Sequence, residues 1–145
     1  MSEIKETVSK TIDYIEDHLG EEITLDDIAD FAGYSKYHLN RVFADAVGCT
    51  IYKYVQKRRL TEAARKLVCS DTSIIDIAYE ANYDSQQAFT LAFKQLYAIT
   101  PQIYREIGRF LPKQEAFMIH TLSNSDLLKQ FNTQLNHNRK WGGAA

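Results

Sequence analysis

One stretch of this chain repeats another, and the repeat constrains the fold more than any other feature of the sequence. Residues 28–54 align with residues 77–104 once a single extra residue is allowed in the second copy. The aligned pairs include Ile28 with Ile77, Ala29 with Ala78, Gly33 with Asn82, Leu39 with Phe89, Phe43 with Phe93, Gly48 with Ala98, Thr50 with Thr100, and Tyr54 with Tyr104. Such self-similarity indicates that one supersecondary unit is built twice.

Helical periodicity runs through both copies and through the segment before them. Apolar residues three or four positions apart predict amphipathic helices, and Ser, Thr, Gly and Pro residues mark where they begin and end. Only two prolines and six glycines occur in 145 residues, which favours long helices over a many-turned β-fold. The predicted helices cover residues 4–19, 25–32, 36–47, 50–68, 74–81, 85–97 and 101–107.

Each copy has the plan of a helix-turn-helix. Small residues, Ala29 and Ala78, lie where the two helices would cross, and Gly33 and Asn82 suit a turn that needs positive φ. The second helix of each copy is apolar on one side, so its other side is free to enter a DNA major groove.

The predicted fold class is therefore all-α. Two helix-turn-helix subdomains, residues 1–49 and 71–107, are joined by a linking helix over residues 50–70 and followed by a C-terminal extension, residues 108–145. A linking helix of 18–20 residues spans roughly 27–30 Å. Successive major-groove faces lie about 34–36 Å apart, so two recognition helices in one chain are expected to reach adjacent grooves.

Charge is segregated along the chain, although the formal net charge is only −2. Residues 1–33 hold two lysines against ten acids, a net of −8, whereas residues 34–66 hold eight Lys or Arg against two acids, a net of +6. This distribution favours a protein with one basic side, which would face a polyanion, and a separate acidic surface formed by residues 1–33. A set of ordinary solvated helix faces is the alternative interpretation.

The motifs of the repeat resemble those of AraC/XylS-type transcription regulators over about residues 4–107. They are Gly33-Tyr34-Ser35-Lys36-Tyr37-His38-Leu39-Asn40-Arg41-Val42-Phe43, Arg59-Leu60-x-x-Ala63, Ser73-Ile74-x-x-Ile77-Ala78, Phe93-Lys94 and Thr100-Pro101-x-x-Tyr104-Arg105. Asp84-Ser85-Gln86-Gln87, and a motif that starts near the N-terminus without a preceding sensor domain, are most similar to the MarA/SoxS/Rob subgroup. The resemblance implies a cytoplasmic, nucleoid-associated activator that binds promoter double-stranded DNA as a monomer, recruits RNA polymerase and needs no cofactor.

The resemblance also implies which side chains contact DNA. The base-reading residues would be Tyr37, Asn40 and Arg41 in the first recognition helix, and Gln86, Gln87, Ala88, Thr90 and Leu91 in the second. Ser35, Lys36, Ser85 and Arg105 would contact phosphates. Arg suits guanine, Asn and Gln suit adenine, and apolar side chains suit the thymine methyl group. The subgroup typically has arginine at the position of Leu91, so weaker binding with less guanine preference is expected from the second helix.

Three of these side chains have a second interpretation. Arg41 is spaced for an ion pair with Asp45 on its own helix. Gln87 is spaced as a capping-box partner of Asp84. Tyr37 is also suited to packing against the turn. Phe43, Phe93 and Tyr104 are assigned to the core.

Other classes of function find little support. No apolar run approaches the roughly 18 residues of a membrane span, the start MSEIKETVSK has no signal-peptide core, and Cys49 and Cys69 form no paired motif. The four histidines show no metal-ligand spacing, and no phosphate loop or G-x-S-x-G elbow occurs, so neither a metal site nor an enzyme is predicted.

The C-terminal extension leaves alternatives open. Ser125 or Asp126 is placed to cap a short helix through Leu135, and residues 136–143 read as a frayed polar end. The extension is interpreted as a helix packing back on the body, as a vestige of an effector domain, or as a protein-contact element. A helical protein-interaction adapter and a ligand-responsive sensor with weakened DNA binding are the alternative functions.

Overall fold

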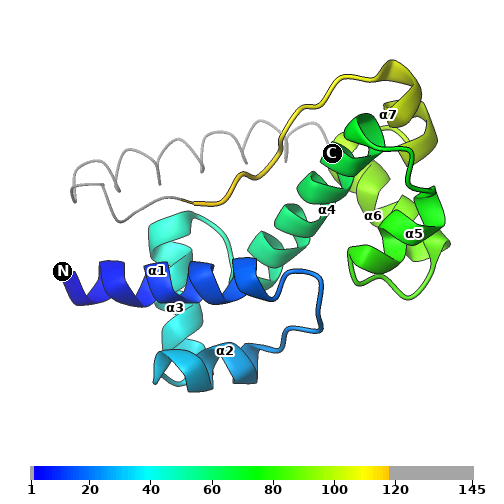
Figure 1. Cartoon of the computed structure of the whole chain (residues 1–145). Helices are drawn as coiled ribbons and strands as arrows, with labels where there is room; N and C mark the ends of the chain where they lie inside the picture. Colours follow the sequence, from blue (N-terminus) through cyan, green and yellow to red (C-terminus); the bar gives the residue numbers. More distant parts are fainter. Residues whose placement is uncertain (1, 118–145) are drawn as a thin grey trace. The chain divides into compact units, whose positions relative to one another are not determined.

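The computed structural model describes residues 2–117, which form seven α-helices and no strand (Figure 1). The helices are α1 (Ser2–Asp17), α2 (Leu25–Ala32), α3 (Lys36–Val47), α4 (Ile51–Cys69), α5 (Ile74–Glu80), α6 (Gln86–Tyr97) and α7 (Pro101–Ile107). The all-α prediction is confirmed. None of the helices in this part of the chain is long and apolar enough to cross a membrane.

Side-chain caps fix where the helices begin, as the sequence predicts. The hydroxyl oxygen of each capping residue accepts a hydrogen bond from the backbone N–H three positions later, which satisfies a donor that the helix leaves unpaired. The capping residues are Thr24, Ser35, Thr50, Ser73, Ser85 and Thr100. The predicted boundaries lie within a residue or two of the observed ones, and the largest difference is α1, which ends at Asp17 rather than Leu19.

The described residues divide into two compact units. The N-terminal unit contains residues 2–17, 23–53 and 117, and the second unit contains residues 18–22 and 54–116. Helix α4 begins in the N-terminal unit and continues in the second unit.

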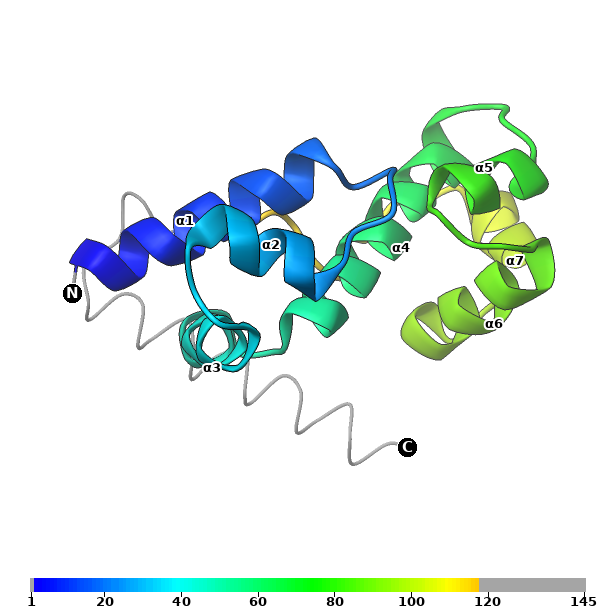
Figure 2. The same cartoon turned by 90° about the horizontal axis from the view of Figure 1, so that it is seen from below.

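In the N-terminal unit, α1 packs against both α2 and α3; α1 and α2 are inclined to each other, and α3 is seen end-on in Figure 2. The core of this unit is apolar and closely packed because each helix contributes its predicted stripe. Its buried side chains include Val8, Ile12, Ile15, Ile28, Leu39 and Phe43. Ile4, expected on the same stripe, lies in the first turn of α1 and is 47% exposed, so the stripe is buried only from Thr7 and Val8 onward.

In the second unit, α5, α6 and α7 pack on α4. Leu60, Ala63, Ala64 and Leu67 of α4 meet apolar residues of the other three helices in one buried cluster. The ring of Phe93 stacks on Tyr97, with centroids 4.7 Å apart, and both rings contact Tyr104 edge-on. Phe43, Phe93 and Tyr104 are buried, which confirms their assignment to the core.

The turns of the two copies adopt the left-handed conformation that the repeat predicts. Gly33 has φ 78° and Asn82, at the matched position, has φ 66°. Asparagine tolerates this region better than most residues, so the exchange preserves the turn. The two crossing residues, Ala29 and Ala78, are buried as expected.

Residues 109–116, here called the strap, follow α7 as an extended segment along α4 (Figure 1). The backbone N–H of Gln114 donates to the buried Thr61 hydroxyl at 3.0 Å, and the Gln114 carbonyl accepts from Arg58 at 2.9 Å. Phe110 lies under the guanidinium of Arg65. This part of the extension therefore packs back on the body, whereas the helix predicted from Ser125 or Asp126 falls outside the described residues.

Candidate nucleic-acid interface

Helix α3 is buried on one side and exposed on the other. Leu39 and Phe43 are 1% and 0% exposed, whereas Tyr37 is 88% exposed and Arg41 is also exposed. The Ser35 cap and the left-handed Gly33 set the direction in which this helix leaves the turn. An aromatic and a guanidinium side chain are thus held one turn apart on the outer side of a rigid helix.

A shallow groove of about 400 Å³ runs beside this outer side. It brings together four of the residues predicted to contact DNA, namely Lys36, Tyr37, Asn40 and Arg41. Leu25, Ala44 and Thr50 complete its lining, so the groove also reaches the starts of α2 and α4. The two cations suit contact with the phosphates of a polyanion, and the aromatic ring suits contact with its bases.

Asn40 is half-buried and already has a partner within the protein. Its Oδ1 atom accepts a hydrogen bond from the backbone N–H of Ile51, the first residue of α4, at 3.1 Å. This oxygen is occupied by the first residue of α4, so it would have to leave that partner to bind adenine. The adenine-reading role of Asn40 remains a prediction.

Helix α6 repeats the arrangement in the second unit. Phe89 and Phe93 are fully buried, while Gln86, Gln87 and Ala88 are exposed and Leu91 is 62% exposed. Thr90 is half-buried. The first two turns of α6 carry no charge, unlike α3 with Lys36 and Arg41, and the exposed cation of α6 is Lys94 in its last turn. Weaker, less guanine-directed contacts by α6 remain a prediction.

The residues predicted to contact phosphates differ in their surroundings. Ser35 and Ser85 cap α3 and α6, so each hydroxyl accepts a backbone N–H. Lys36 pairs with Asp26 at 3.1 Å, yet half of its side chain is exposed. Arg105 lies on α7 and donates to the carbonyl oxygens of Leu67, Ser70 and Thr72 at 2.6–3.3 Å. Arg105 therefore holds the end of α4 and the following loop.

The alternative interpretations of three residues can now be compared with the structure. Among the residues that the structure describes, Arg41 forms no ion pair with Asp45. The cap of α6 is Ser85 rather than Asp84. A capping box between Asp84 and Gln87 is therefore not formed, because Asp84 is not the capping residue. The exposure of Tyr37 excludes close packing against the turn.

The sequence analysis overlooked the first turn of α4. Thr50 lines the groove beside α3, and Tyr52, 75% exposed, lies next to the exposed Lys53. The signal was present in the sequence, because Tyr52 does not fall on the apolar stripe of α4 that contains Tyr54 and Leu60. An exposed tyrosine beside a lysine is suited to a phosphate contact.

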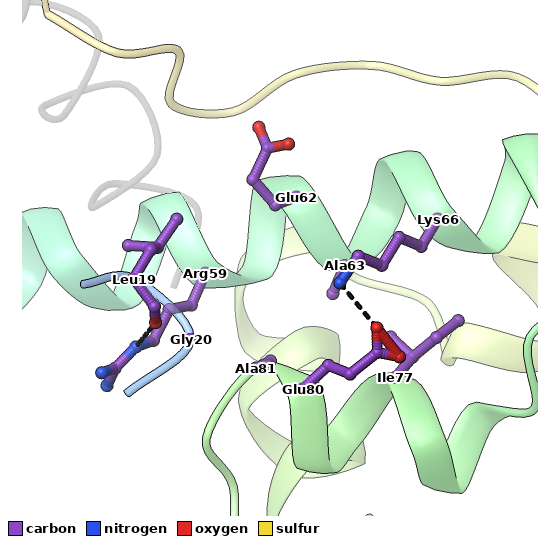
Figure 3. A pocket seen from close by; sticks show the side chains of 9 residues that line it. All are labelled: Leu19, Gly20, Arg59, Glu62, Ala63, Lys66, Ile77, Glu80 and Ala81. Carbon is purple, nitrogen blue, oxygen red and sulfur yellow. Dashed lines mark hydrogen bonds and ion pairs between the residues drawn. The ribbon is translucent and has the colours of Figure 1, made fainter. Parts of the chain in front are cut away.

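A smaller pocket lies in the second unit between α4, α5 and residues 19–20 (Figure 3). Arg59 reaches out of α4 to the carbonyl oxygens of Leu19 and Glu21, and Lys66 pairs with Glu80 at 2.9 Å across the pocket. Arg59 thus holds the loop before α2, as Arg105 holds the loop before α5. The contacts around this pocket join the ends of elements and support the fold.

Glu62 is the centre of a charge network on α4. Burial raises the pKa of the Glu62 carboxyl, but hydrogen bonds from Arg65 and Arg58 outweigh this and hold the pKa below its usual value. Its ionised form therefore stabilises the fold at neutral pH, and this contribution is lost as the pH falls through the lowered pKa. No group of three His, Cys, Asp or Glu side chains within residues 2–117 is arranged to hold a metal ion.

Two helix-turn-helix units, α2–α3 before α4 and α5–α6 after it, each with a second helix exposed on one side, define a tandem helix-turn-helix protein. A family model described as "Helix-turn-helix domain" matches residues 28–107, more than half of the chain. The chain belongs to the family of transcription regulators with AraC-type helix-turn-helix DNA-binding domains. Members of this family are regulators and not enzymes.

Three relatives illustrate the match. The chain is 48% identical over 98 residues to the probable transcription factor PqrA of Proteus vulgaris. The matched region covers 68% of this chain and 80% of PqrA. The chain is 42% identical over 98 residues to the transcriptional activator AarP of Providencia stuartii, covering 68% and 73%. With the HTH-type regulator YbfP of Bacillus subtilis it shares 42% identity over 112 residues, or 77% of this chain but only 38% of YbfP.

Solved structures show the same fold. The C-terminal domain of AraT, a response regulator from Geobacillus stearothermophilus, superposes with a TM-score of 0.68 at 27% identity, covering 80% of this chain and 96% of that domain. The DNA-binding domain of the global transcriptional factor AdpA, solved with a target DNA, superposes with a TM-score of 0.66 at 23% identity, covering 69% and 90%.

Proposed function

We propose that this chain is a sequence-specific activator that binds promoter double-stranded DNA as a monomer, in the cytoplasm on the nucleoid. Residues 1–49 and 71–107 each act as one reading subdomain, and α3 and α6 enter two major grooves about one helical turn apart. The groove beside α3, with Lys36, Tyr37 and Arg41 around it, is the observation that carries this proposal.

The length of α4 supports a two-groove mode of binding. Its 19 residues correspond to about 28 Å of helix, which is most of the roughly 34–36 Å between successive major-groove faces. The binding of target DNA by AdpA, which shares the fold, also supports DNA as the partner.

Base reading is assigned unequally to the two helices. Arg41 donates to guanine O6 and N7, which distinguishes G·C from other pairs, and Tyr37 contacts a neighbouring base. Gln86 and Gln87 suit adenine, while Ala88, Thr90 and Leu91 suit thymine methyl groups. Lys36, Ser35, Ser85, Tyr52 and Lys53 contact phosphates and so set the register of the complex.

RNA polymerase is the proposed protein partner, and the acidic side of the N-terminal unit is the surface proposed to meet it. Within this unit, residues 2–17 and 23–33 hold eight acids against two lysines, a net charge of −6, which DNA repels. On α2, Phe31 is 56% exposed, and its ring lies 5.0 Å from that of Tyr14. An exposed phenylalanine beside a half-buried tyrosine, among acids, suits a basic protein surface.

The test is selection of bound sequences from a random duplex pool, followed by affinity measurement at several salt concentrations. We expect two conserved half-sites about one turn apart and a Kd of about 10 nM or tighter. Arg41→Ala should relax one G·C preference by about tenfold and leave the other half-site unchanged. Arg109→Ala, which removes the same charge from an exposed position after α7, is the matched control. Binding without any sequence preference would refute the proposal.

A further inference from the structure

The two copies of the repeat differ at one hydrogen bond next to the recognition helix. In both copies a threonine caps the following helix: Thr50 accepts from Lys53 N–H, and Thr100 accepts from Ile103 N–H. In the first copy alone, a second acceptor, Asn40 Oδ1, comes from the recognition helix and takes the N–H of Ile51.

The repeat alignment explains why the second copy has no counterpart. Asn40 is matched by Thr90, and Ile51 is matched by Pro101. Proline has no backbone N–H, so the helix that begins at Pro101 has no donor at this position. Thr90 therefore has no such group to satisfy, whereas Asn40 does.

The hydrogen bond of Asn40 cannot be released without cost. Ile51 is only 3% exposed, so water cannot readily replace a lost partner of its N–H. Only the oxygen of the amide can accept from an N–H, which fixes the orientation of the Asn40 side chain. Reading adenine with both ends of the amide needs that same oxygen, so it competes with the start of α4.

We infer that Asn40 is a positioning residue, which holds α3 in register on the start of α4 and thereby aims Tyr37 and Arg41, and that it does not read adenine. This inference rests on the proposed DNA-binding function. The two recognition helices are then held differently. A side-chain hydrogen bond from Asn40 joins α3 to the start of α4. In α6 the matched Thr90 has no such bond to make and can contact DNA instead.

Thermal unfolding of the full chain tests the tie without DNA. Asn40→Ala removes the acceptor and should lower the Tm by about 3–6 °C. Asn40→Asp keeps an oxygen at a helix N-terminus and should restore the Tm to near the wild-type value at pH 7. Thr90→Ala, the matched position, should change the Tm by less than about 2 °C. An unchanged Tm for Asn40→Ala would overturn the inference.

Selection from the random duplex pool tests the consequence for reading. Asn40→Asp should select the wild-type sequence at every position, with uniformly weaker affinity because the added charge repels phosphates. Asn40→Ala should weaken all preferences of the first half-site together. Loss of a single A·T preference in both variants, with the others intact, would show adenine reading and overturn the inference. If the wild-type chain selects no sequence, the proposed function fails. The Tm comparison alone then tests whether Asn40 holds α3 on the start of α4.

Discussion

Ala98 occupies a backbone conformation that its matched residue, Gly48, adopts more readily. Gly48 has φ 97° and Ala98 has φ 70°, and both end a recognition helix in the left-handed region. An L-residue with a Cβ is strained there, by about 1–2 kcal/mol, whereas glycine is not. The second copy therefore carries local strain that the first copy avoids.

Replacing Ala98 with glycine should raise the free energy of unfolding by about 0.5–1 kcal/mol. The gain is the relief of strain, reduced by the larger backbone entropy of glycine in the unfolded chain. Urea denaturation of Ala98→Gly measures it as a higher midpoint with an unchanged m-value. Gly48→Ala is the matched control and should lower the midpoint by a similar or larger amount. Destabilisation by Ala98→Gly would contradict the expected strain.

Single residues show where sequence reasoning succeeds and where it fails. The left-handed turn at Asn82 could be predicted, because asparagine is one of the few residues that tolerate positive φ. Nothing in an alanine indicates such a conformation, and only the alignment with Gly48 singles out position 98. Asn40 and Arg105 each bind backbone groups distant in sequence, and no local pattern reveals those partners.

At the scale of elements, the strap shows how the second unit extends beyond its helices. Two buried threonines allow its contribution to be measured. Thr61 and Thr11 are both fully buried, but Thr61 accepts the N–H of Gln114 from the strap, while Thr11 donates to the Thr7 carbonyl of its own helix. The first bond joins distant segments, and the second duplicates a helical one.

Thr61→Val should lower the free energy of unfolding by about 1–3 kcal/mol, because it leaves the buried Gln114 N–H without a partner. Thr11→Val keeps the same shape, strands no group and should change stability by less than about 0.5 kcal/mol. Thermal or urea unfolding of both variants provides the comparison. Equal effects would mean that the strap contributes little to the fold.

The helices themselves were predictable to within a residue or two, because six of the seven described helices, α2 to α7, begin at a Ser or Thr cap. The strap was not predicted as an extended segment, since its fixed conformation comes from tertiary partners on α4 rather than from its own periodicity. Arg58 and Arg65, which the sequence showed only as two of the eight cations of residues 34–66, are partners of Glu62 and the strap.

At the scale of the whole molecule, the two recognition helices have the same formal charge of +1 but differ at matched positions, because Leu91 of α6 stands where α3 has Arg41. Leu91→Arg should strengthen binding about tenfold at sites with a guanine in the second half-site. It should also steepen the dependence of log K on log salt by about one unit, because one more cation approaches the phosphates.

Leu111→Arg is the matched control, since Leu111 is 59% exposed against 62% for Leu91 but lies on the strap. It should leave guanine preference unchanged. Competition binding against guanine-substituted duplexes distinguishes the two variants. Identical gains from both would point to non-specific attraction and against base reading by α6.

If α3 and α6 read DNA as proposed, their different outer residues require two different half-sites. A palindrome, the natural target of a symmetric dimer, would fit only one end of this chain well. If the chain binds DNA as proposed, the complex has polarity: turning the same recognition sequence around would exchange the ends of the duplex that α3 and α6 contact. Where such a regulator assists transcription, the orientation of its binding sequence would matter as much as its distance from the start of the gene.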